Sequence, residues 1–582
     1  MNFNDLKKNL KKDYSKLKKV KVAVLGDSAT QLLVQAVRGY GYEVGYNFEM
    51  YEADYDQVDL QVYDKDSEFY ETKSEYVIIY NSAEKLMKKF YKLGSQDKMN
   101  FAEKHIEAIA NMYETITRNN KCKVIYFNYV ELNDYVFGNY SNKTSYSFLY
   151  QIRKINYELM NLSQKYKNLF VNDAASLHNT YGQAFCTDPK ITISTEIIFS
   201  FDFLPIIAKN TVDIILAIAG LMKKCVILDL DNTLWGGIIG DDGVENIQIG
   251  ELGIGKAFTA LQLYLKQLKQ RGIILAVCSK NTEHIAKEPF EKHPDMVLKL
   301  ADIAIFVANW ENKAQNIKYI QSILNIGFDS MVFLDDNPFE RNMVKTHIPE
   351  ITVPDLPEDP AEYVNYLRSC NLFETASYTE EDEQRTQQYQ EEAQRAIVQQ
   401  QFVNEDEFLG SLNMISDVKP FNKFSIPRVS QLTQRSNQFN LRTVRYSEEE
   451  VTNITNSDDY ITIDFTLEDK YGDYGLISLI ILKKQGEALF VDTWIMSCRV
   501  LKRGMEKFVL NQIVEQARKN GFKEIIGEYL PTAKNGMVKN HYSDLGFSEE
   551  KADTSLWKLE VGSFKEYPTF IKIKAAVEEP VK

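Results

Sequence analysis

Short apolar runs alternate with helix-like stretches through the first part of the chain. The runs fall at residues 20–25, 76–80, 124–127 and 169–171, and the segments between them carry apolar side chains at helical spacing. Short apolar runs bounded by polar residues are typical of buried β-strands. Strands that alternate with helices indicate a parallel sheet with crossover helices.

The same alternation continues into a second unit. Apolar runs lie at residues 225–230, 273–278, 303–307 and 331–334, and each ends in polar residues where a loop should begin. This pattern again predicts parallel strands joined by helices. The sequence therefore contains two successive α/β units.

The pattern changes after about residue 378. Residues 378–412 are rich in Glu and Gln, contain no Pro and have no Gly before position 410, which predicts a polar connecting helix. Beyond residue 415, β-type runs at 461–465, 476–482 and 488–496 precede a helix at 505–517 and a strand at 524–530. This order predicts an α+β module.

Chain length supports a division into several domains. At about 150 residues per domain, 582 residues with 44% hydrophobic content should form three or four domains. The predicted fold class is α/β, with two doubly wound parallel-sheet domains followed by an α+β domain. The expected boundaries are 1–222, 223–375, a helical connection at 376–414, and 415–582.

Composition excludes several classes of protein. A net charge of −14 and a pI near 5.2 argue against a nucleic-acid partner, because phosphate backbones select basic surfaces. No CxxC spacing occurs among the cysteines, which favours a reduced, cytoplasmic protein without a zinc site. The basic N-terminus has no apolar signal segment, and no run reaches about 18 apolar residues, so we expect neither export nor a membrane partner. The cysteines are Cys122, Cys186, Cys225, Cys278, Cys370 and Cys498.

The segment CVILDLDNTLWGG places two carboxylates directly after a predicted strand. Asp229 and Asp231 form a DxDxT pattern with Thr233. Phosphoryl transfer needs one carboxylate to attack phosphorus and a second to protonate the leaving group and then activate water. We assign the first role to Asp229 and the second to Asp231, with Thr233 supporting the turn.

Later strand ends carry the other groups that this chemistry requires. Ser279 supplies a hydroxyl for phosphoryl oxygens, and Lys313, at the start of a predicted helix, supplies positive charge for the transition state. Asp335 and Asp336 follow a further strand, where oxygen ligands suit Mg²⁺. The predicted metal ligands are Asp229, Asp231, Asp335 and Asp336.

Each of these residues alone is commonly a turn or surface residue, but their joint order at successive strand ends indicates a phosphoryl-transfer site. Residues 236–250 predict a short flap rather than a large cap domain. A noncatalytic scaffold is the alternative from another class. It would have no need for this set of groups at these positions.

The motifs DLDNTLWGGIIGDDG, AVCSKN, NWENK and FLDDNPFERNMV resemble the FkbH-like subfamily (IIIC) of haloacid dehalogenase (HAD) proteins. This resemblance implies a Mg²⁺-dependent phosphatase of aspartyl-phosphate mechanism that acts on a phosphorylated three-carbon acid. It further implies transfer of the glyceryl group to the thiol of an acyl carrier protein. The alternative hypothesis is a plain small-molecule phosphatase whose outer domains set its specificity.

The block QLTQRSNQFNLRTVRY, with DYGLISLI, MSCRVLKRGMEKFVL and HYSDLGF, resembles an acetyltransferase (GNAT) fold. The resemblance implies a pantetheine-binding loop, here Arg499, Lys502, Arg503 and Gly504. Lys502 replaces the first glycine of the usual phosphate loop, which puts acetyl-CoA binding in doubt and leaves docking of a carrier-protein arm open. A solvated basic turn is the simpler interpretation of the same residues.

Acyl loading requires a thiol. Cys498 lies beside the expected pantetheine loop and is the first choice for it. Cys278 precedes Ser279, but strand alternation should direct its side chain into the core, which makes it the second choice.

The segment VAVLGDSATQLL resembles the first block of SGNH hydrolases and places Ser28 as the nucleophile. The late Asp-x-x-His block of that family is altered, because His178 follows Asp173 by five residues. Asn81 and Asn128 could serve as oxyanion donors, although turn residues are commoner. We therefore expect an SGNH-like domain that has lost hydrolase activity, since serine needs a base.

Overall fold

The computed structural model describes residues 1–574 except 133, 380–384, 400, 401, 403, 498, 499, 502, 533 and 551–554. The chain forms two compact units, Met1–Ile218 and Ala219–Lys582. In the described parts of the chain, no helix is both long enough and apolar enough to cross a membrane.

The first unit is built on a parallel sheet of strand order β2-β1-β3-β4-β5, the doubly wound order in which the chain reverses direction beside the first strand. The strands are β1 (Lys18–Gly26), β2 (Tyr46–Glu52), β3 (Tyr76–Tyr80), β4 (Lys123–Phe127) and β5 (Leu169–Asn172). The four strands predicted for this part of the chain are confirmed. The edge strand β2, whose only buried side chain is Phe48, is not among the predicted strands.

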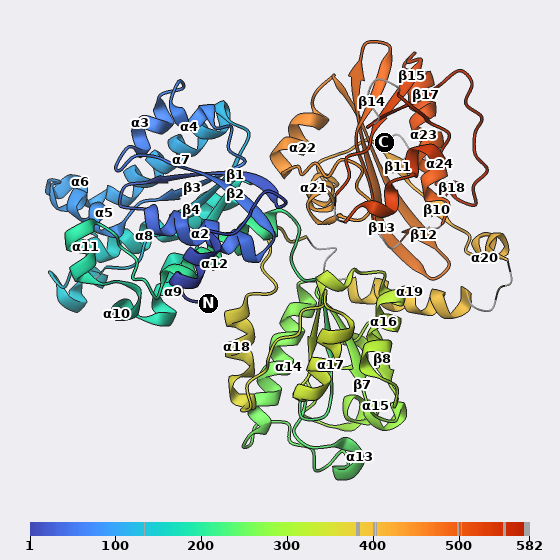
Figure 1. Cartoon of the computed structure of the whole chain (residues 1–582), viewed down its shortest axis with the longest axis horizontal. Coiled ribbons are helices and arrows are strands. Elements are labelled where there is room, and N and C mark those ends of the chain that lie inside the picture. The colour runs from blue at the N-terminus through green and yellow to red at the C-terminus, as the bar shows by residue number, and fades with distance from the viewer. Residues whose placement is uncertain are drawn as a thin grey trace, which may run out of the picture. The chain divides into compact units, whose positions relative to one another are not determined.

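Helices cover both faces of this sheet (Figure 1). On one face, the apolar side chains of β1, β3 and β4 pack against α5 (Ala83–Tyr91), α7 (Phe101–Asn119) and α8 (Phe148–Lys165). Elsewhere in the unit, α2 (Gln31–Glu43) contacts β2, and α12 (Leu204–Ile218) contacts both α2 and β5.

The second unit begins with a smaller parallel sheet of order β8-β7-β6-β9. Its strands are β6 (Cys225–Leu228), β7 (Ile274–Ser279), β8 (Ile305–Ala308) and β9 (Met331–Leu334). One face packs on α14 (Gly255–Gln270) and the other on α16 (Lys313–Leu324). Because the strands are parallel, their carboxyl ends meet at one edge, where α/β proteins place their ligands.

The C-terminal part contains a mixed sheet with β12 (Tyr460–Asp469), β13 (Gly472–Gln485), β14 (Ala488–Met496) and β15 (Glu524–Glu528) at its centre. Figure 1 shows α23 (Met505–Lys519) on one face and α21 (Ile426–Arg435) with α22 (Glu448–Thr455) on the other. These elements confirm the predicted fold class, which is two parallel-sheet α/β folds followed by an α+β fold.

The connection between these two sheets differs from the prediction. The single helix expected over residues 378–412 is wrong, because the structure has α19 (Arg385–Gln399) and a separate α20 (Glu405–Ser411). Asn404 has an extended backbone, and its side chain accepts a hydrogen bond of 2.9 Å from the Asp406 N–H. It therefore starts a new helix.

Candidate active site

Asp229 follows β6 directly, and its N–H donates to the Leu334 carbonyl of β9 at 2.9 Å. The chain then turns at Asn232, which has a φ of +55°, a left-handed conformation that Asn tolerates better than most residues. The Asn232 side chain stabilises the turn by accepting a hydrogen bond of 3.0 Å from the Gly237 N–H. This turn holds Asp229 and Asp231 at the carboxyl edge of the sheet.

Lys313 connects two of the predicted carboxylates. Its Nζ lies 2.9 Å from Asp229 Oδ1 and 2.6 Å from Asp335 Oδ2, and its side chain is only 4% exposed. Burial acts to lower the pKa of Lys313, but the negative charges of Asp229 and Asp335 outweigh it and raise that pKa above its ordinary value. The lysine is therefore a fixed positive charge beside the predicted nucleophile.

Asp335 and Asp336 are held by backbone and side-chain hydrogen bonds. Asp335 Oδ1 accepts from the Asn337 N–H at 2.9 Å, and the Asp336 N–H donates to Thr233 Oγ1 at 3.1 Å. Burial and the Asp229 charge raise the pKa of Asp335 to about 6, and the same two causes raise the pKa of Asp336. Thr233 thus ties the DxDxT turn to the loop after β9.

The structure brings together three of the four predicted metal ligands. Oxygens of Asp229, Asp335 and Asp336 all lie within 4.8 Å of one another. A cluster of carboxylate oxygens at this spacing fits a hard divalent cation such as Mg²⁺. The Asp231 carboxylate is not a member of this group.

Asp231 instead accepts three hydrogen bonds. Its Oδ1 accepts from Trp235 Nε1 and from the Ile239 N–H, each at 3.0 Å, and its Oδ2 accepts from Asn281 Nδ2 at 3.2 Å. Burial raises the pKa of Asp231 despite these bonds. Its position beside Asp229 and its fixed orientation suit a carboxyl group that exchanges a proton.

Ser279, the last residue of β7, is buried at the same edge of the sheet, next to β6. Sequence reasoning missed several residues that hold this site. Arg341 Nη1 donates to the carbonyls of Asp335 and Asp336 at 2.8 and 2.6 Å. Asn281 and Trp235 orient Asp231 from separate loops. These residues carry polar groups directly after or near strand ends, and this position is the only sign of them in the sequence. Their hydrogen-bond acceptors depend on the conformation of the folded loops.

Cys278 points into the core, as strand alternation predicts. It packs in the apolar cluster between β7 and α16, and its thiol lies 3.7 Å from the Lys313 carbonyl. Burial strongly raises the pKa of this thiol. Since a thiolate is the reactive form, this position does not favour an acyl-carrying role.

Cys498, Arg499 and Lys502, predicted in the C-terminal loop, lie outside the described residues. The Arg503 guanidinium is engaged by carboxylates: its Nη2 lies 2.9 Å from Glu392 Oε2 and its Nη1 lies 3.3 Å from Asp469 Oδ2. Arg395 of α19 also pairs with Asp469, at 2.9 Å. Gly504 begins α23 with a φ of +74°. A pantetheine phosphate bound by Arg503, as predicted, would have to compete with the Glu392 carboxylate for the guanidinium group.

The N-terminal unit does not assemble a serine–histidine pair among its described residues. Ser28 Oγ and His178 Nε2 are both buried without a hydrogen-bond partner. Asp173 caps α9 (Ala174–Tyr181) through the Ser176 N–H and accepts a bond of 2.6 Å from Asn128. Asn81 donates to the Tyr126 hydroxyl at 3.0 Å. These contacts give Asp173, Asn128 and Asn81 structural roles in this state.

The chain is strongly similar to a solved structure. The N-terminal part of the protein BF1531 from Bacteroides fragilis, containing a phosphatase domain complexed with Mg, is 54% identical, with a TM-score of 0.63. The match covers 65% of this chain and 100% of that chain. No curated protein matches the sequence.

Several solved acetyltransferases match about a quarter of the chain with low scores. The ribosomal-protein-S18-alanine N-acetyltransferase from Escherichia coli is 15% identical, covering 26% of this chain and 97% of that chain, with a TM-score of 0.20. Spermidine N-acetyltransferase from Vibrio cholerae is 12% identical, covering 25% and 96%, with a TM-score of 0.21. Scores this low carry no argument about the fold or role of any part of this chain.

The FkbH N-terminal domain family matches residues 21–216. BF1531 is 54% identical to this chain, and the match covers the whole of its solved part. This match and the family match together establish the family to which the chain belongs. The chain belongs to the family of the Bacteroides fragilis protein BF1531 and carries the FkbH N-terminal domain.

Proposed function

We propose that the protein is a Mg²⁺-dependent phosphatase of the HAD type that uses Asp229 as its nucleophile. The observation that carries this proposal is the buried Lys313 ammonium, which lies within 3 Å of both Asp229 and Asp335. Phosphoryl transfer depends mainly on such fixed charges around the transferred group.

Mg²⁺ would be held by Asp229, Asp335 and Asp336, whose oxygens are close enough to share one ion. When bound, Mg²⁺ neutralises charge on the phosphoryl oxygens. The Mg complex of the BF1531 phosphatase domain, 54% identical to this chain, supports this choice of metal.

In the proposed reaction, a carboxylate oxygen of Asp229 attacks phosphorus and forms an acyl phosphate. The bond from phosphorus to the substrate oxygen breaks, and that oxygen takes a proton from Asp231. Water then attacks the acyl phosphate and gives a proton to Asp231, which releases inorganic phosphate and restores the Asp229 carboxylate. Lys313 stabilises the charge of both transition states, and Ser279 offers a hydroxyl to the phosphoryl oxygens.

The test is release of inorganic phosphate from small phosphate esters by the full chain, with Mg²⁺ or with EDTA. We expect release with Mg²⁺ and at most background release with EDTA. Equal release under both conditions would exclude the proposed metal dependence. A panel that includes phosphorylated three-carbon acids identifies the preferred substrate class.

We further propose that the substrate is a phosphorylated three-carbon acid and that the glyceryl group passes to the thiol of an acyl carrier protein. The support is the resemblance of the central motifs to FkbH-like proteins and the match of the N-terminal domain to the FkbH family. In this proposal, the Cys498 thiolate attacks the acyl carbon of a bisphosphoglycerate, the bond from that carbon to the acyl-phosphate oxygen breaks, and inorganic phosphate leaves. Cys498 then carries the acyl group as a thioester, with Cys278 as the less favourable choice because it is buried. The SGNH-like unit is inactive, and the GNAT-like module receives the carrier arm near Arg499, Lys502, Arg503 and Gly504.

Intact-mass measurement after incubation with a bisphosphoglycerate and Mg²⁺ tests the acyl transfer. We expect an added mass equal to the acyl group that hydroxylamine removes, and its loss in Cys498→Ala with phosphatase activity retained. An adduct that persists in Cys498→Ala but disappears in Cys278→Ala would assign the thiol to the central sheet. If phosphate is released without any adduct, the plain small-molecule phosphatase is the better description.

A further inference from the structure

The loops at the carboxyl edge of the small parallel sheet expose large apolar side chains around the phosphoryl site. Trp310 lies two residues after β8 and Phe339 lies four residues after Asp335, and their exposed fractions are 74% and 71%. Leu252 and Ile238, in the segment between β6 and α14, are 86% and 46% exposed. Single exposed apolar residues are common, but several on the loops of one site indicate a contact surface.

Backbone hydrogen bonds hold two of these loops against the site. The Ile239 N–H donates to Asp231 Oδ1 at 3.0 Å, and the Asn309 N–H donates to the Ser279 carbonyl at 3.2 Å. Each of these two donor residues is the direct sequence neighbour of an exposed apolar residue. The exposed side chains therefore border the phosphoryl site.

These loops also carry an excess of negative charge. We call residues 236–254, 309–312 and 336–339 the rim, and the rim contains no Lys or Arg. Its exposed acidic residues form no ion pair with any described residue, and they are Asp241, Asp242, Glu245, Glu251 and Glu311. A surface that is both acidic and apolar favours a partner with positive and apolar groups.

The cations that flank the rim in sequence leave this excess in place. Lys280 pairs with Glu340 at 2.7 Å, Lys313 pairs with the carboxylates of the site, and Arg341 is buried. Lys256, near the start of α14, is exposed and offsets at most one of the acidic charges. The charge of the rim is therefore available to a partner.

The rim is wider than a small metabolite. Because β8 and β9 are the edge strands of the sheet β8-β7-β6-β9, the loops of Trp310 and Phe339 are separated by three strand spacings, or about 14 Å. A three-carbon chain, with bonds of about 1.5 Å, cannot reach both loops while its phosphate lies beside Asp229. An extended polypeptide advances about 3.3 Å per residue, so about four or five residues would cross the rim.

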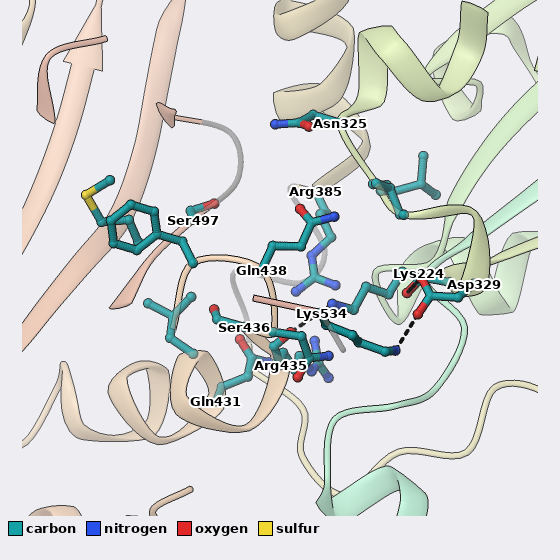
Figure 2. A pocket seen from close by; sticks show the side chains of 18 of the residues that line it. Lys224, Asn325, Asp329, Arg385, Gln431, Arg435, Ser436, Gln438, Ser497 and Lys534 are labelled. Carbon is teal, nitrogen blue, oxygen red and sulfur yellow. Dashed lines mark hydrogen bonds and ion pairs between the residues drawn. The ribbon is translucent and has the colours of Figure 1, made fainter. Parts of the chain in front are cut away.

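The opposite edge of the same sheet contacts the C-terminal part of the chain (Figure 2). Asp329, two residues before β9, forms an ion pair with Lys534, and Lys224, directly before β6, donates to the Arg435 carbonyl at 2.8 Å. These contacts place the C-terminal part at the amino ends of the strands. The rim lies at the carboxyl ends, where its apolar side chains are exposed.

We propose that the rim binds a phosphorylated polypeptide in which basic and apolar residues flank the phosphorylated side chain. The basic residues pair with the acidic residues of the rim, and the apolar residues contact Trp310 and Phe339. Asp229 takes the phosphoryl group, the side-chain oxygen of the polypeptide takes a proton from Asp231, and water then releases inorganic phosphate. This inference rests on the proposed phosphatase chemistry but not on the proposed three-carbon substrate.

Binding is measured by fluorescence anisotropy with the Asp229→Asn variant and Mg²⁺, so that the peptides keep their phosphate. The probes are labelled phosphoserine peptides of equal length, one with Lys and Leu around the phosphoserine and one with Glu and Leu. The Lys–Leu peptide without phosphate is the third probe. Phosphate release by the otherwise unchanged chain is followed separately with both phosphopeptides and with p-nitrophenyl phosphate.

Two further changes, each added to Asp229→Asn, test the rim. Trp310→Ala removes an apolar contact, and Tyr319→Ala, at an exposed position of α16, is its control. A triple variant removes three charges of the rim through Asp241→Asn, Glu251→Gln and Glu311→Gln. Its control removes three exposed charges elsewhere in the second unit, through Glu291→Gln, Glu350→Gln and Glu515→Gln.

We expect the Lys–Leu phosphopeptide to bind at least about tenfold more tightly than either other peptide. Trp310→Ala and the triple rim variant should each weaken this binding at least about tenfold, while both controls keep the affinity of the parent. Added NaCl should reduce the preference for the Lys–Leu phosphopeptide, because salt screens exposed charges.

Equal binding of the Lys–Leu and Glu–Leu phosphopeptides, or unchanged affinity in both rim variants, would overturn this inference. Release of phosphate from p-nitrophenyl phosphate without any preference between the peptides would overturn it and leave the phosphatase proposal standing. Selective binding of the Lys–Leu phosphopeptide without phosphate release from any substrate would support the rim and overturn the phosphatase proposal alone.

Discussion

The indole N–H of Trp235 donates a hydrogen bond of 3.0 Å to the Oδ1 atom of Asp231. Trp235 is fully buried, so the ring cannot move away without disturbing the core around it. Since Asn281 holds the other carboxylate oxygen, Asp231 has one orientation, directed by groups from two loops. A proton donor in phosphoryl transfer requires this kind of fixed position.

The Asp231→Asn variant should release phosphate about 10²–10⁴ times more slowly than wild type, because the amide cannot give a proton to the leaving group. Trp235→Phe removes one orienting hydrogen bond and should cost about tenfold. Initial rates with a poor and a good leaving group separate these effects, since acid catalysis matters less for a good one. An unchanged rate in Asp231→Asn would mean that another group is the acid.

The Asp229→Asn variant should lose phosphate release while keeping its fold, because an amide of nearly the same shape cannot form an acyl phosphate. Turnover and melting temperature should be measured on the same preparation. Turnover that persists after wild-type contamination has been excluded would remove Asp229 from the role of nucleophile.

Lys313→Met should destabilise the second unit by about 3–5 kcal/mol in EDTA, because it leaves Asp229 and Asp335 buried without their counter-charge. Mg²⁺ should restore part of this loss by binding the same carboxylates. Urea unfolding with and without Mg²⁺ measures both effects. Lys345→Met is the control, because its partner Asp355 is 71% exposed and the pair should contribute at most about 1 kcal/mol. Equal losses in the two variants would contradict the buried-pair interpretation.

Alanine at Ser28 or at His178 should leave Mg²⁺-dependent phosphate release within about twofold of wild type, because the described residues form no serine–histidine hydrogen bond. Hydrolysis of a chromogenic acetate ester should be followed alongside. Ester hydrolysis by wild type that disappears in Ser28→Ala would show an active serine hydrolase in the N-terminal unit.

Asp27→Asn should stabilise the first unit at pH 7.5 more than at pH 4.5. Burial raises the pKa of Asp27 to about 6, from an ordinary value near 3.8. Between these two values the folded state holds a proton that the unfolded state has lost, so the stability of wild type falls as pH rises. The amide removes this loss of at most about 3 kcal/mol, and its oxygen can still accept the Ser82 N–H bond of 2.8 Å.

Unfolding midpoints of the first unit at the two pH values measure this difference. Asp59→Asn, at an exposed position of α3 (Val58–Tyr63), serves as the control and should show no comparable pH dependence. A midpoint shift in Asp27→Asn that is the same at both pH values would contradict the pKa argument.

The central strands could be predicted because both faces of each are buried, which leaves a continuous apolar run such as Tyr76–Tyr80. The edge strand β2 buries only Phe48 and therefore leaves no such run. The break between α19 and α20 has no Pro or Gly to mark it, and depends on the capping bond of Asn404. The domain boundaries at 222, 375 and 414 stay predictions.

The carboxylates of the site could be predicted because their order along the chain follows the order of the strand ends. The residues that orient them could not, since Arg341 reaches carbonyls five and six positions back and Asn281 reaches across 50 positions. These contacts depend on loop conformations that no local pattern specifies. Asp231 also lies outside the carboxylate cluster because of the loop conformations around it, which the sequence pattern does not specify.

Ion pairs between α19 and the C-terminal sheet limit where the chain can be cut into fragments. Arg395 pairs with Asp469, and Glu392 pairs with Arg503. The Asp469 side chain is fully buried in the presence of α19, and a fragment begun at residue 415 would lose Arg395, one of the two arginines that pair with it. That fragment would also leave Arg503 without Glu392. The smallest autonomous C-terminal fragment should therefore include α19, although this helix also packs against α16 of the preceding sheet.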